Sequence, residues 1–247
     1  MQRYFVEESF NTDLQLTVRG ENARHISKVM RMQAGDEIII VQNHVAYVCR
    51  ILSVGEEVLV EQTGNTIPSP EMPIQVDIAC GLPKGDRLEW ITQKGTELGM
   101  HALIPFAAER SVVKWDEKKG VKKRDRLQKI AKEAAEQSHR TFLPLILEPQ
   151  TFNQLLELLP NYDVVFVADE EDAKKEKRTR FAEQLKKVYD KESKSILLIF
   201  GPEGGISRKE VEKLLENGAK VMSLGPRILR AETAPLYALS AISYEFE

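Results

Sequence analysis

The chain has 247 residues, of which 42% are hydrophobic and 30% are charged, and its formal net charge is −3. Such a composition is typical of a globular protein with room for two domains. The sequence contains no run of about 18 apolar residues and no apolar signal core at its start, so we expect a cytoplasmic protein without a membrane span. The weakly acidic balance argues against a protein that coats nucleic acid.

The sequence gives little indication of a metal site or of disulfide bonds. Cys49 and Cys80 are the two cysteines, and they lie far apart in the chain. Two cysteines are too few for a disulfide framework or a Cys-rich zinc site. The four histidines have no spacing suited to a metal ion. We therefore expect no metal.

The first 66 or so residues have the pattern of a small β-rich domain. Short β-branched runs occupy residues 37–41, 45–52 and 57–62, and turn residues separate them. This pattern predicts hairpins that close a barrel or a small sheet.

One helix, from about residue 21 to 30, is expected before these strands. At 100° per residue, Arg24, Lys28 and Arg31 lie within about 60° of one another. The helix would then present three cations, and both a phosphate contact and an ordinary solvated face fit that spacing. The residues on the opposite side, expected to dock on the domain, are Ile26, Val29 and Met30.

The chain changes character near residue 70. Residues 64–73 contain three prolines, a glycine and an asparagine, which favour an extended linker. We place the domain boundary there, giving domains 1–70 and 71–247. Beyond it strands alternate with helices, which predicts an α/β fold with a mostly parallel sheet covered on both faces. The expected strands are 74–80, 103–106, 164–168, 196–200 and 220–224, and the expected helices are 86–98, 124–137, 152–159, 174–189, 208–216 and 235–246.

A basic stretch lies within the second domain. Between Arg110 and Lys132 there are ten lysines or arginines and three acidic residues. A local excess of cations can bind phosphates even on a weakly acidic protein, because salt confines the attraction to about 10 Å. A solvated helix face explains the same stretch equally well.

The motif FGPEGGIS, residues 200–207, follows an apolar strand and precedes a helix. Ser207 and Glu210 have the spacing of a capping box, and three glycines allow a ligand to approach the backbone closely. The motif lacks the Gly-Lys-Ser/Thr of a P-loop and the spacing of a dinucleotide fingerprint, and Glu203 would repel a phosphate. A ligand that is neutral or cationic at Glu203 fits better, although a plain strand-to-helix turn also fits.

A second glycine loop, LGPRILRAETAP at residues 224–235, follows the next strand. It places Ile228 and Leu229, which can line an apolar pocket, beside Arg230 and Glu232. Ligands of open α/β sheets bind at the carboxyl ends of the strands, beside the loops that follow those strands. The two loops together therefore predict a small-molecule site.

These two loops, with QKGTELG at 93–99 and EQSHR at 136–140, closely resemble the RsmE family of bacterial methyltransferases. Members of that family modify N3 of a uridine in 16S ribosomal RNA. The resemblance continues through RYF at 3–5 and HISKVMRMQAGD at 25–36, so it covers nearly the whole chain.

The resemblance implies a SPOUT-class C-terminal domain, an α/β fold with a deep trefoil knot that binds S-adenosylmethionine. Sequence periodicity would not have suggested a knot, because true knots are very rare. It also implies a PUA-like N-terminal domain that contributes to RNA binding, and a homodimer that acts on small-subunit ribosomal RNA or the 30S subunit. The implied cofactor-binding residues are Val167, Gly201, Pro202, Glu203, Gly204, Gly205, Leu224, Gly225, Ile228 and Leu229, and the implied RNA-binding residues are Arg3, Arg24, Lys28 and Arg31.

This reaction makes two demands on the side chains. Uracil N3 becomes a good nucleophile only as its proton leaves, so the site needs a proton acceptor and a cation for the charge that spreads onto O2 and O4. Arg230 is the expected cation, because a guanidinium stays charged and offers several donors. Glu232 or Glu203 can accept the proton, and either can instead make a structural hydrogen bond.

Two other functions remain open at this point. The chain can be a SPOUT methyltransferase for another RNA site or base. It can also be a non-catalytic RNA-binding or ribosome-assembly protein that keeps the fold. A nucleotide-binding protein is the least favoured, because the P-loop residues are missing and Glu203 stands in the glycine loop.

Overall fold

The computed structural model describes residues 1–169 and 180–247. These residues divide into two compact units. Unit 1 contains Met1–Glu71 and Ala135–Leu143, and unit 2 contains Met72–Ala134 and Pro144–Glu247. The short segment 135–143 thus belongs with the N-terminal residues, although it is distant from them in sequence.

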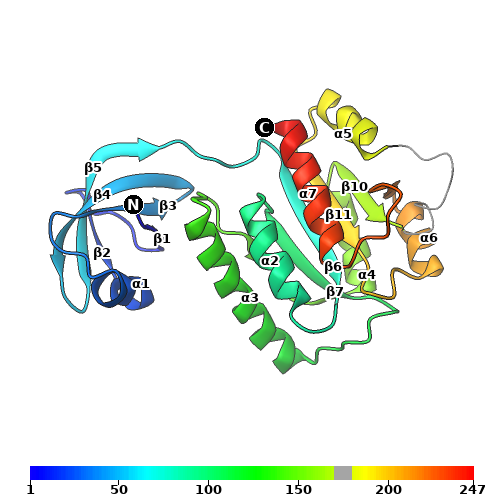
Figure 1. The fold of residues 1–247 in the computed structure, drawn as a ribbon, viewed down its shortest axis with the longest axis horizontal. Helices are drawn as coiled ribbons and strands as arrows, with labels where there is room; N and C mark the ends of the chain where they lie inside the picture. Colours follow the sequence, from blue (N-terminus) through cyan, green and yellow to red (C-terminus); the bar gives the residue numbers. More distant parts are fainter. Residues whose placement is uncertain (170–179) are drawn as a thin grey trace. The chain divides into compact units, whose positions relative to one another are not determined.

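Unit 1 is built on a curled five-stranded sheet (Figure 1). Its strand order is β1-β3-β4-β5-β2, in which β1 pairs parallel with β3 and the other pairs are antiparallel. The expected hairpins therefore form, with β1 and β2 at the two ends of the sheet. The strands are β1 (Arg3–Phe5), β2 (Gln15–Val18), β3 (Glu37–Gln42), β4 (Val45–Val54) and β5 (Val58–Ile67).

The helical segment of unit 1 differs from the expected regular helix. It begins as α1 (Gly20–Arg24) and continues as a π-helical turn, η1 (His25–Val29). The Met30 amide donates to the His25 carbonyl at 2.9 Å, which is the i→i+5 bond of a π-helix. In a π-helix the rotation per residue is smaller than the 100° of an α-helix. Val29 is consequently 66% exposed, and of the three residues expected to dock only Ile26 is buried. The prediction that Val29 and Met30 face the core is wrong, because it assumed 100° per residue.

Glu71 holds segment 135–143 within unit 1. Its carboxylate accepts hydrogen bonds from Arg140 Nε at 3.0 Å and from the amides of Thr141 at 2.8 Å and Phe142 at 3.0 Å. Burial raises the pKa of Glu71, but the bonds and charge of Arg140 and the two amides outweigh it, so the pKa lies below its ordinary value. Arg3 Nη1 adds a bond to the Arg140 carbonyl at 2.8 Å.

Unit 2 contains a seven-stranded parallel sheet. Its strand order is β12-β10-β11-β6-β7-β8, and β9 also pairs with β7. The central strands are almost continuously apolar, as expected for strands covered on both faces. The strands are β6 (Gln75–Gly81), β7 (Ala102–Ala107), β8 (Leu145–Ile146), β9 (Gln150–Thr151), β10 (Val164–Ala168), β11 (Ser195–Phe200) and β12 (Lys220–Met222).

Helices cover both faces of this sheet, as the sequence predicts (Figure 1). One core cluster joins Ile104 and Val167 of the sheet to Leu155 of α4 and Leu214 of α6. On the other face, α7 packs against α2, α5 and β11. The helices are α2 (Arg87–Glu97), α3 (Glu117–Gln137), α4 (Phe152–Leu158) with the 3-10 turn η2 (Leu159–Asn161), α5 (Phe181–Asp190), α6 (Arg208–Glu216) and α7 (Thr233–Phe246).

Several element boundaries differ from the expected ones. Helix α3 begins at Glu117 rather than at residue 124, because the Asp116 carboxylate accepts the Lys119 amide at 2.8 Å and caps an earlier turn. The start of the helix expected over 174–189 lies outside the described residues, and its described part is α5. Strands β1, β2, β8 and β9 have two to four residues, too few for an alternating pattern to reveal them.

Two absences concern the described residues alone. Over 1–169 and 180–247, no helix is long and apolar enough to cross a membrane. The same ranges contain no group of three or more histidine, cysteine or acidic side chains that could hold a metal ion.

We expect Glu71→Gln to lower the free energy of unfolding by about 3 kcal/mol at pH 7, because it removes the carboxylate charge that pairs with the buried Arg140 guanidinium. The folded-state pKa of Glu71 is depressed, so its stabilising effect is present above the unfolded pKa and is lost as the pH falls. The difference between variant and wild type should therefore shrink below about pH 4. Urea unfolding at pH 7 and at low pH measures both effects.

Glu37→Gln is the matched control in unit 1. Glu37 pairs with Arg50 at 3.5 Å through side chains that are 41% and 58% exposed, so its loss should cost less than about 1 kcal/mol. Equal destabilisation by the two substitutions would contradict the anchoring role of Glu71.

Candidate active site

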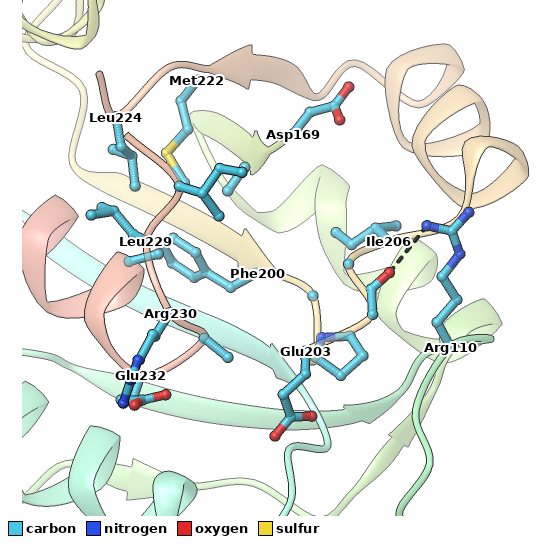
Figure 2. Close-up of a pocket in the computed structure, with 18 of the residues that line it drawn as sticks. Arg110, Asp169, Phe200, Glu203, Ile206, Met222, Leu224, Leu229, Arg230 and Glu232 are labelled. Atoms are coloured by element: carbon cyan, nitrogen blue, oxygen red, sulfur yellow. Dashed lines mark hydrogen bonds between the residues drawn. The ribbon is translucent and has the colours of Figure 1, made fainter. Parts of the chain in front are cut away.

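A cavity of about 720 Å³ lies at the carboxyl edge of the unit 2 sheet. Parallel pairing of β6, β10, β11 and β12 brings the ends of these strands to one edge. The loop that follows β11 and the loop that follows β12 both line the cavity (Figure 2). The two glycine motifs, some twenty residues apart in sequence, thus belong to one site.

The first loop is fixed where it enters α6. The Ser207 hydroxyl accepts the Glu210 amide at 3.3 Å, and the Glu210 carboxylate accepts the Ser207 amide at 3.0 Å. This confirms the predicted capping box. Glu210 also accepts the Glu109 amide at 2.8 Å, from the loop that follows β7. The buried Glu210 therefore joins two loops of the site, a role that its capping position did not reveal.

Gly201 allows the first loop to turn back on itself. A Cβ atom at this position would lie 2.6 Å from the Gly205 carbonyl carbon and 2.7 Å from the Ile206 nitrogen. Both neighbours are backbone atoms, which cannot move aside as a flexible side chain can. The tight turn in this loop therefore requires glycine at position 201.

Arg87, at the start of α2, connects the two glycine loops. Its guanidinium contacts the Glu203 carboxylate through Nη1 and approaches Glu232 Oε2 with Nε at 3.2 Å. Glu203 also accepts the Lys84 amide at 2.9 Å. One cation thus holds a carboxylate from each loop, and the charge of Glu203 is balanced inside the protein.

Two further arginines reinforce the wall of the cavity. Arg110 Nη1 donates to the Gly204 carbonyl at 3.0 Å, and Arg208 Nη2 donates to Asp169 Oδ1 at 2.6 Å. Each bond joins residues that follow different strands. The cavity wall therefore depends on contacts between loops as well as on the sheet.

The cavity has an apolar end and a charged end. Figure 2 shows Phe200, Met222, Leu224 and Leu229 gathered at one end, and Glu203, Arg230 and Glu232 at the other. Such a site suits a ligand with an uncharged ring and a charged remainder.

Nine of the ten residues expected to bind the cofactor line the cavity. The exception is Val167, which is fully buried in the core, while Ala168 and Asp169 after it reach the cavity. The Val167 side chain does not reach the cavity, because successive residues of a strand face opposite sides and Val167 packs in the core with α4 and α6. The nine are Gly201, Pro202, Glu203, Gly204, Gly205, Leu224, Gly225, Ile228 and Leu229.

The two expected catalytic residues also line the cavity. Within residues 1–169 and 180–247, the Arg230 guanidinium has no ion-pair or hydrogen-bond partner. Glu232 precedes α7, and its Oε2 atom is buried without a hydrogen bond in the described part of the chain. The contact with Arg87 at 3.2 Å lies within ion-pair distance but lacks the alignment of a hydrogen bond.

The expected RNA-binding residues do not all reach the surface. Arg24, Lys28 and Arg31 are exposed. Arg3 is 3% exposed, and its Nη1 donates to the carbonyls of His139 and Arg140. The expectation that Arg3 binds RNA is therefore not supported, because its cationic group is used inside unit 1.

Comparisons with known proteins agree with this geometry. Residues 70–243 match the model of an RNA methyltransferase domain, and residues 18–61 match that of an RNA methyltransferase PUA domain. The chain is 48% identical to the ribosomal RNA small subunit methyltransferase E of Bacillus subtilis, over 100% of this chain and 98% of the relative. It is 34% identical to the protein of that name from Synechocystis, over 92% of this chain and 72% of the relative.

The chain belongs to the ribosomal RNA small subunit methyltransferase E family. This confirms the resemblance drawn from the sequence, and with it a PUA domain alongside a parallel α/β domain. Among solved structures, the family member from Neisseria gonorrhoeae, bound to S-adenosyl methionine, has a TM-score of 0.85 at 27% identity, covering 100% of this chain and 98% of that chain. A putative methyltransferase from Legionella pneumophila in complex with the same cofactor has a TM-score of 0.84 at 26% identity, covering 98% and 97%.

Sequence reasoning missed the three arginines that brace this family member's cavity. Arg87, Arg110 and Arg208 carry no motif of their own. Arg87 and Arg110 follow the strands β6 and β7, so their positions obey the rule that gathers loops at the carboxyl edge. Applying that rule to every predicted strand would have made these two residues candidates.

We expect Gly201→Ala to destabilise the protein by about 2 kcal/mol, because the added methyl group overlaps the backbone at Gly205 and Ile206. Urea unfolding measures the change. Gly55→Ala is the control, since a Cβ atom there would have its nearest neighbour, the Glu57 carbonyl oxygen, at an ordinary 3.7 Å. A Gly201 variant as stable as the Gly55 variant would show that the loop has more room than the structure gives it.

Proposed function

We propose that the protein transfers a methyl group from S-adenosylmethionine to N3 of a uridine in small-subunit ribosomal RNA. Membership of the methyltransferase E family, with a full-length relative at 48% identity, supports the RNA substrate. The observation that carries the proposal is the cavity at the carboxyl edge, where two glycine loops meet and Arg230 and Glu232 stand together at one end.

The residues that line the cavity fit this cofactor. Its volume of about 720 Å³ lies in the range of ligand pockets, about 300–1,000 Å³. The lining contains both arginines and carboxylates, as suits a ligand that carries charges of both signs. The backbone of Gly201 and Gly225 would hold it closely, and Phe200 and Leu229 would contact its uncharged ring. When bound, S-adenosylmethionine supplies a methyl group on a sulfonium, and the electron pair of the broken bond stays on sulfur.

Glu232 is the better supported proton acceptor. Uridine N3 must lose its proton while the new bond to carbon forms. Glu203 accepts the Lys84 amide and contacts Arg87, so its Oε1 atom is engaged. Glu232 Oε2 lies 3.2 Å from Arg87 Nε, but it accepts no aligned hydrogen bond within the described residues. We infer that the N3 proton passes to Glu232, a choice that the sequence left open.

Arg230 supplies the positive charge that this step needs. As the proton leaves, negative charge spreads onto O2 and O4 of the uracil ring, and a guanidinium can donate to either oxygen. Arg230 is exposed and has no partner among the described residues, so its donors are free for a substrate. Arg230 and Glu232 lie in the same loop, so the charge stabiliser and the proton acceptor are close together.

We also propose that residues 1–70 bind RNA as a PUA-like domain and that residues 71–247 form the methyltransferase domain. The match of residues 18–61 to a PUA model supports the first role, and the exposed Arg24, Lys28 and Arg31 offer cations to phosphates. The match of residues 70–243 supports the second role.

The remaining properties that we propose are those of the SPOUT class. They are a trefoil knot formed by the loops after β11 and β12, a homodimer, and a cytoplasmic location. Strand β12 pairs with β10 rather than with β11, and both loops line one cavity, which supports interlaced segments. Tyr237 and Tyr244 of α7 are 45% and 90% exposed, and such aromatic side chains are favoured at protein interfaces.

We expect Arg87→Ala to weaken S-adenosylmethionine binding about tenfold, because the variant removes the cation that joins Glu203 to Glu232 and with it the bridge that positions the two loops. Isothermal titration calorimetry measures the dissociation constant. Arg87→Lys should fall between variant and wild type, because an ammonium keeps the charge but not the fork of donors.

The control for Arg87 is Arg19→Ala. Arg19 pairs with Glu57 at 2.7 Å in unit 1, and both side chains are more than half exposed. Its loss should leave cofactor binding unchanged. An Arg87→Ala variant that binds the cofactor like wild type would show that the two loops hold their positions without this bridge.

We expect Arg230→Ala to lower kcat for methyl transfer by about 10²–10³-fold with little change in cofactor affinity, because it removes charge stabilisation from the transition state. The assay uses small ribosomal subunits from a strain that lacks this methyltransferase, and mass mapping of the RNA locates the product. Wild-type activity in the variant would eliminate Arg230 as the charge stabiliser. A methylated base other than N3 of uridine would refute the proposed substrate.

A further inference from the structure

A groove with an apolar part and a basic part runs beside the first turns of α3 in unit 2. Its apolar hollow has a volume of about 210 Å³, and its basic hollow about 460 Å³. Lys119 and Lys123 line both hollows, so the two are neighbours. We call this feature the α3 groove. The apolar hollow is lined by Pro83, Gly85, Leu88, Val113, Trp115 and Leu127, together with the charged residues Glu89, Lys119 and Lys123.

The apolar hollow has the size and lining to receive a flat ring. Its volume exceeds the roughly 150 Å³ of a cavity that holds benzene. Trp115 is half-buried and is one of the residues that line the hollow. Indole rings stack on nucleobases whatever the base, because every base presents a π face.

The basic hollow offers charge without forming a specific anion pocket. Five cations and one carboxylate, that of Asp116, line it. Asp116 caps α3 by accepting the Lys119 amide at 2.8 Å, and Glu89 lies 2.7 Å from Arg126 and 3.7 Å from Lys123. An excess of positive charge therefore remains over the first turns of α3. The five cations are Lys118, Lys119, Lys122, Lys123 and Arg126.

The groove lies next to the candidate active site because both use residues 83–88, which lead from β6 into the first turn of α2. On one side of this segment, the Lys84 amide and the Arg87 side chain contact Glu203 in the cofactor cavity. On the other side, Gly85 and Leu88 line the apolar hollow. A strand that delivers one nucleotide to the cavity would have its neighbouring nucleotides within reach of the groove.

We propose that the α3 groove binds a nucleotide that flanks the target uridine, with its base stacked on Trp115 and its phosphates on Lys119 and Lys122. This inference rests on the proposed function and adds a second binding surface for the same RNA. A flat apolar hollow beside a cationic one matches the alternation of base and phosphate along a single strand. An acidic peptide would satisfy the lysines but would leave the apolar hollow without a matching group.

The experiment compares binding of Trp115→Ala, Trp115→Phe and the Lys119→Gln/Lys122→Gln double variant to two probes. One probe is the small ribosomal subunit from a strain that lacks the methyltransferase, and the other is deproteinised small-subunit ribosomal RNA. Filter binding at several salt concentrations gives affinity and salt dependence. Calorimetry with S-adenosylmethionine reports separately on the cofactor cavity.

We expect Trp115→Ala to weaken binding of both probes about tenfold, and Trp115→Phe to restore most of the affinity because phenylalanine also stacks. The double lysine variant should reduce the slope of log affinity against log salt by about two, because two phosphates would no longer be neutralised by the protein. The affinity of every variant for S-adenosylmethionine should equal that of wild type.

Several results would overturn the proposal. Wild-type affinity in Trp115→Ala, equally weak binding by the Ala and Phe variants, or an unchanged salt slope in the lysine variant would each do so. An effect seen with intact subunits but not with free RNA would assign the groove to a ribosomal protein instead. The variants can show the expected binding effects while the wild-type protein transfers no methyl group. That result would refute the proposed reaction but would leave the groove as an RNA-binding site.

Discussion

Parallel pairing of the unit 2 strands is the constraint on which the site depends. Because β6, β7, β10, β11 and β12 run in the same direction, the loops after them emerge at one edge of the sheet. Residues separated by more than a hundred positions, such as Arg87 and Glu203, come into contact there. Backbone groups at the strand ends, which have no further ladder to join, are available for a ligand.

Charge pairing then gives these loops definite positions. Glycine makes the turns possible but does not hold them, since its backbone adopts many conformations. Arg87 connects the two glycine loops, Arg110 bonds the first of them, and Glu210 joins that loop to the one after β7. The same contacts leave Arg230 without a partner among the described residues and Glu232 with a buried oxygen that accepts no hydrogen bond there. Arg230 is therefore available for chemistry, whereas Glu232 both contacts the bridging Arg87 and is the proposed proton acceptor.

Cations serve three different purposes in this protein. Arg3 and Arg140 are buried in unit 1, where their donors satisfy backbone carbonyls and Glu71. Arg87, Arg110 and Arg208 join loops at the cavity. Lys118, Lys119 and Lys122 line the basic hollow of the α3 groove, where we propose that RNA phosphates bind. Residue type alone does not distinguish these roles. The burial of each cation and the groups that it contacts do distinguish them.

The sequence determined the α/β pattern of the second domain, the two glycine loops and their meeting at one site, the capping box at Ser207, and the family. These features depend on contacts within a few residues or on motifs that stay contiguous in the chain. Only the tertiary structure placed Val167 in the core, exposed Val29 through a π-helical turn, buried Arg3, and brought Arg87 to the cavity. Those outcomes depend on strand facing, helix winding and contacts between distant segments, which a local pattern of residue types does not contain.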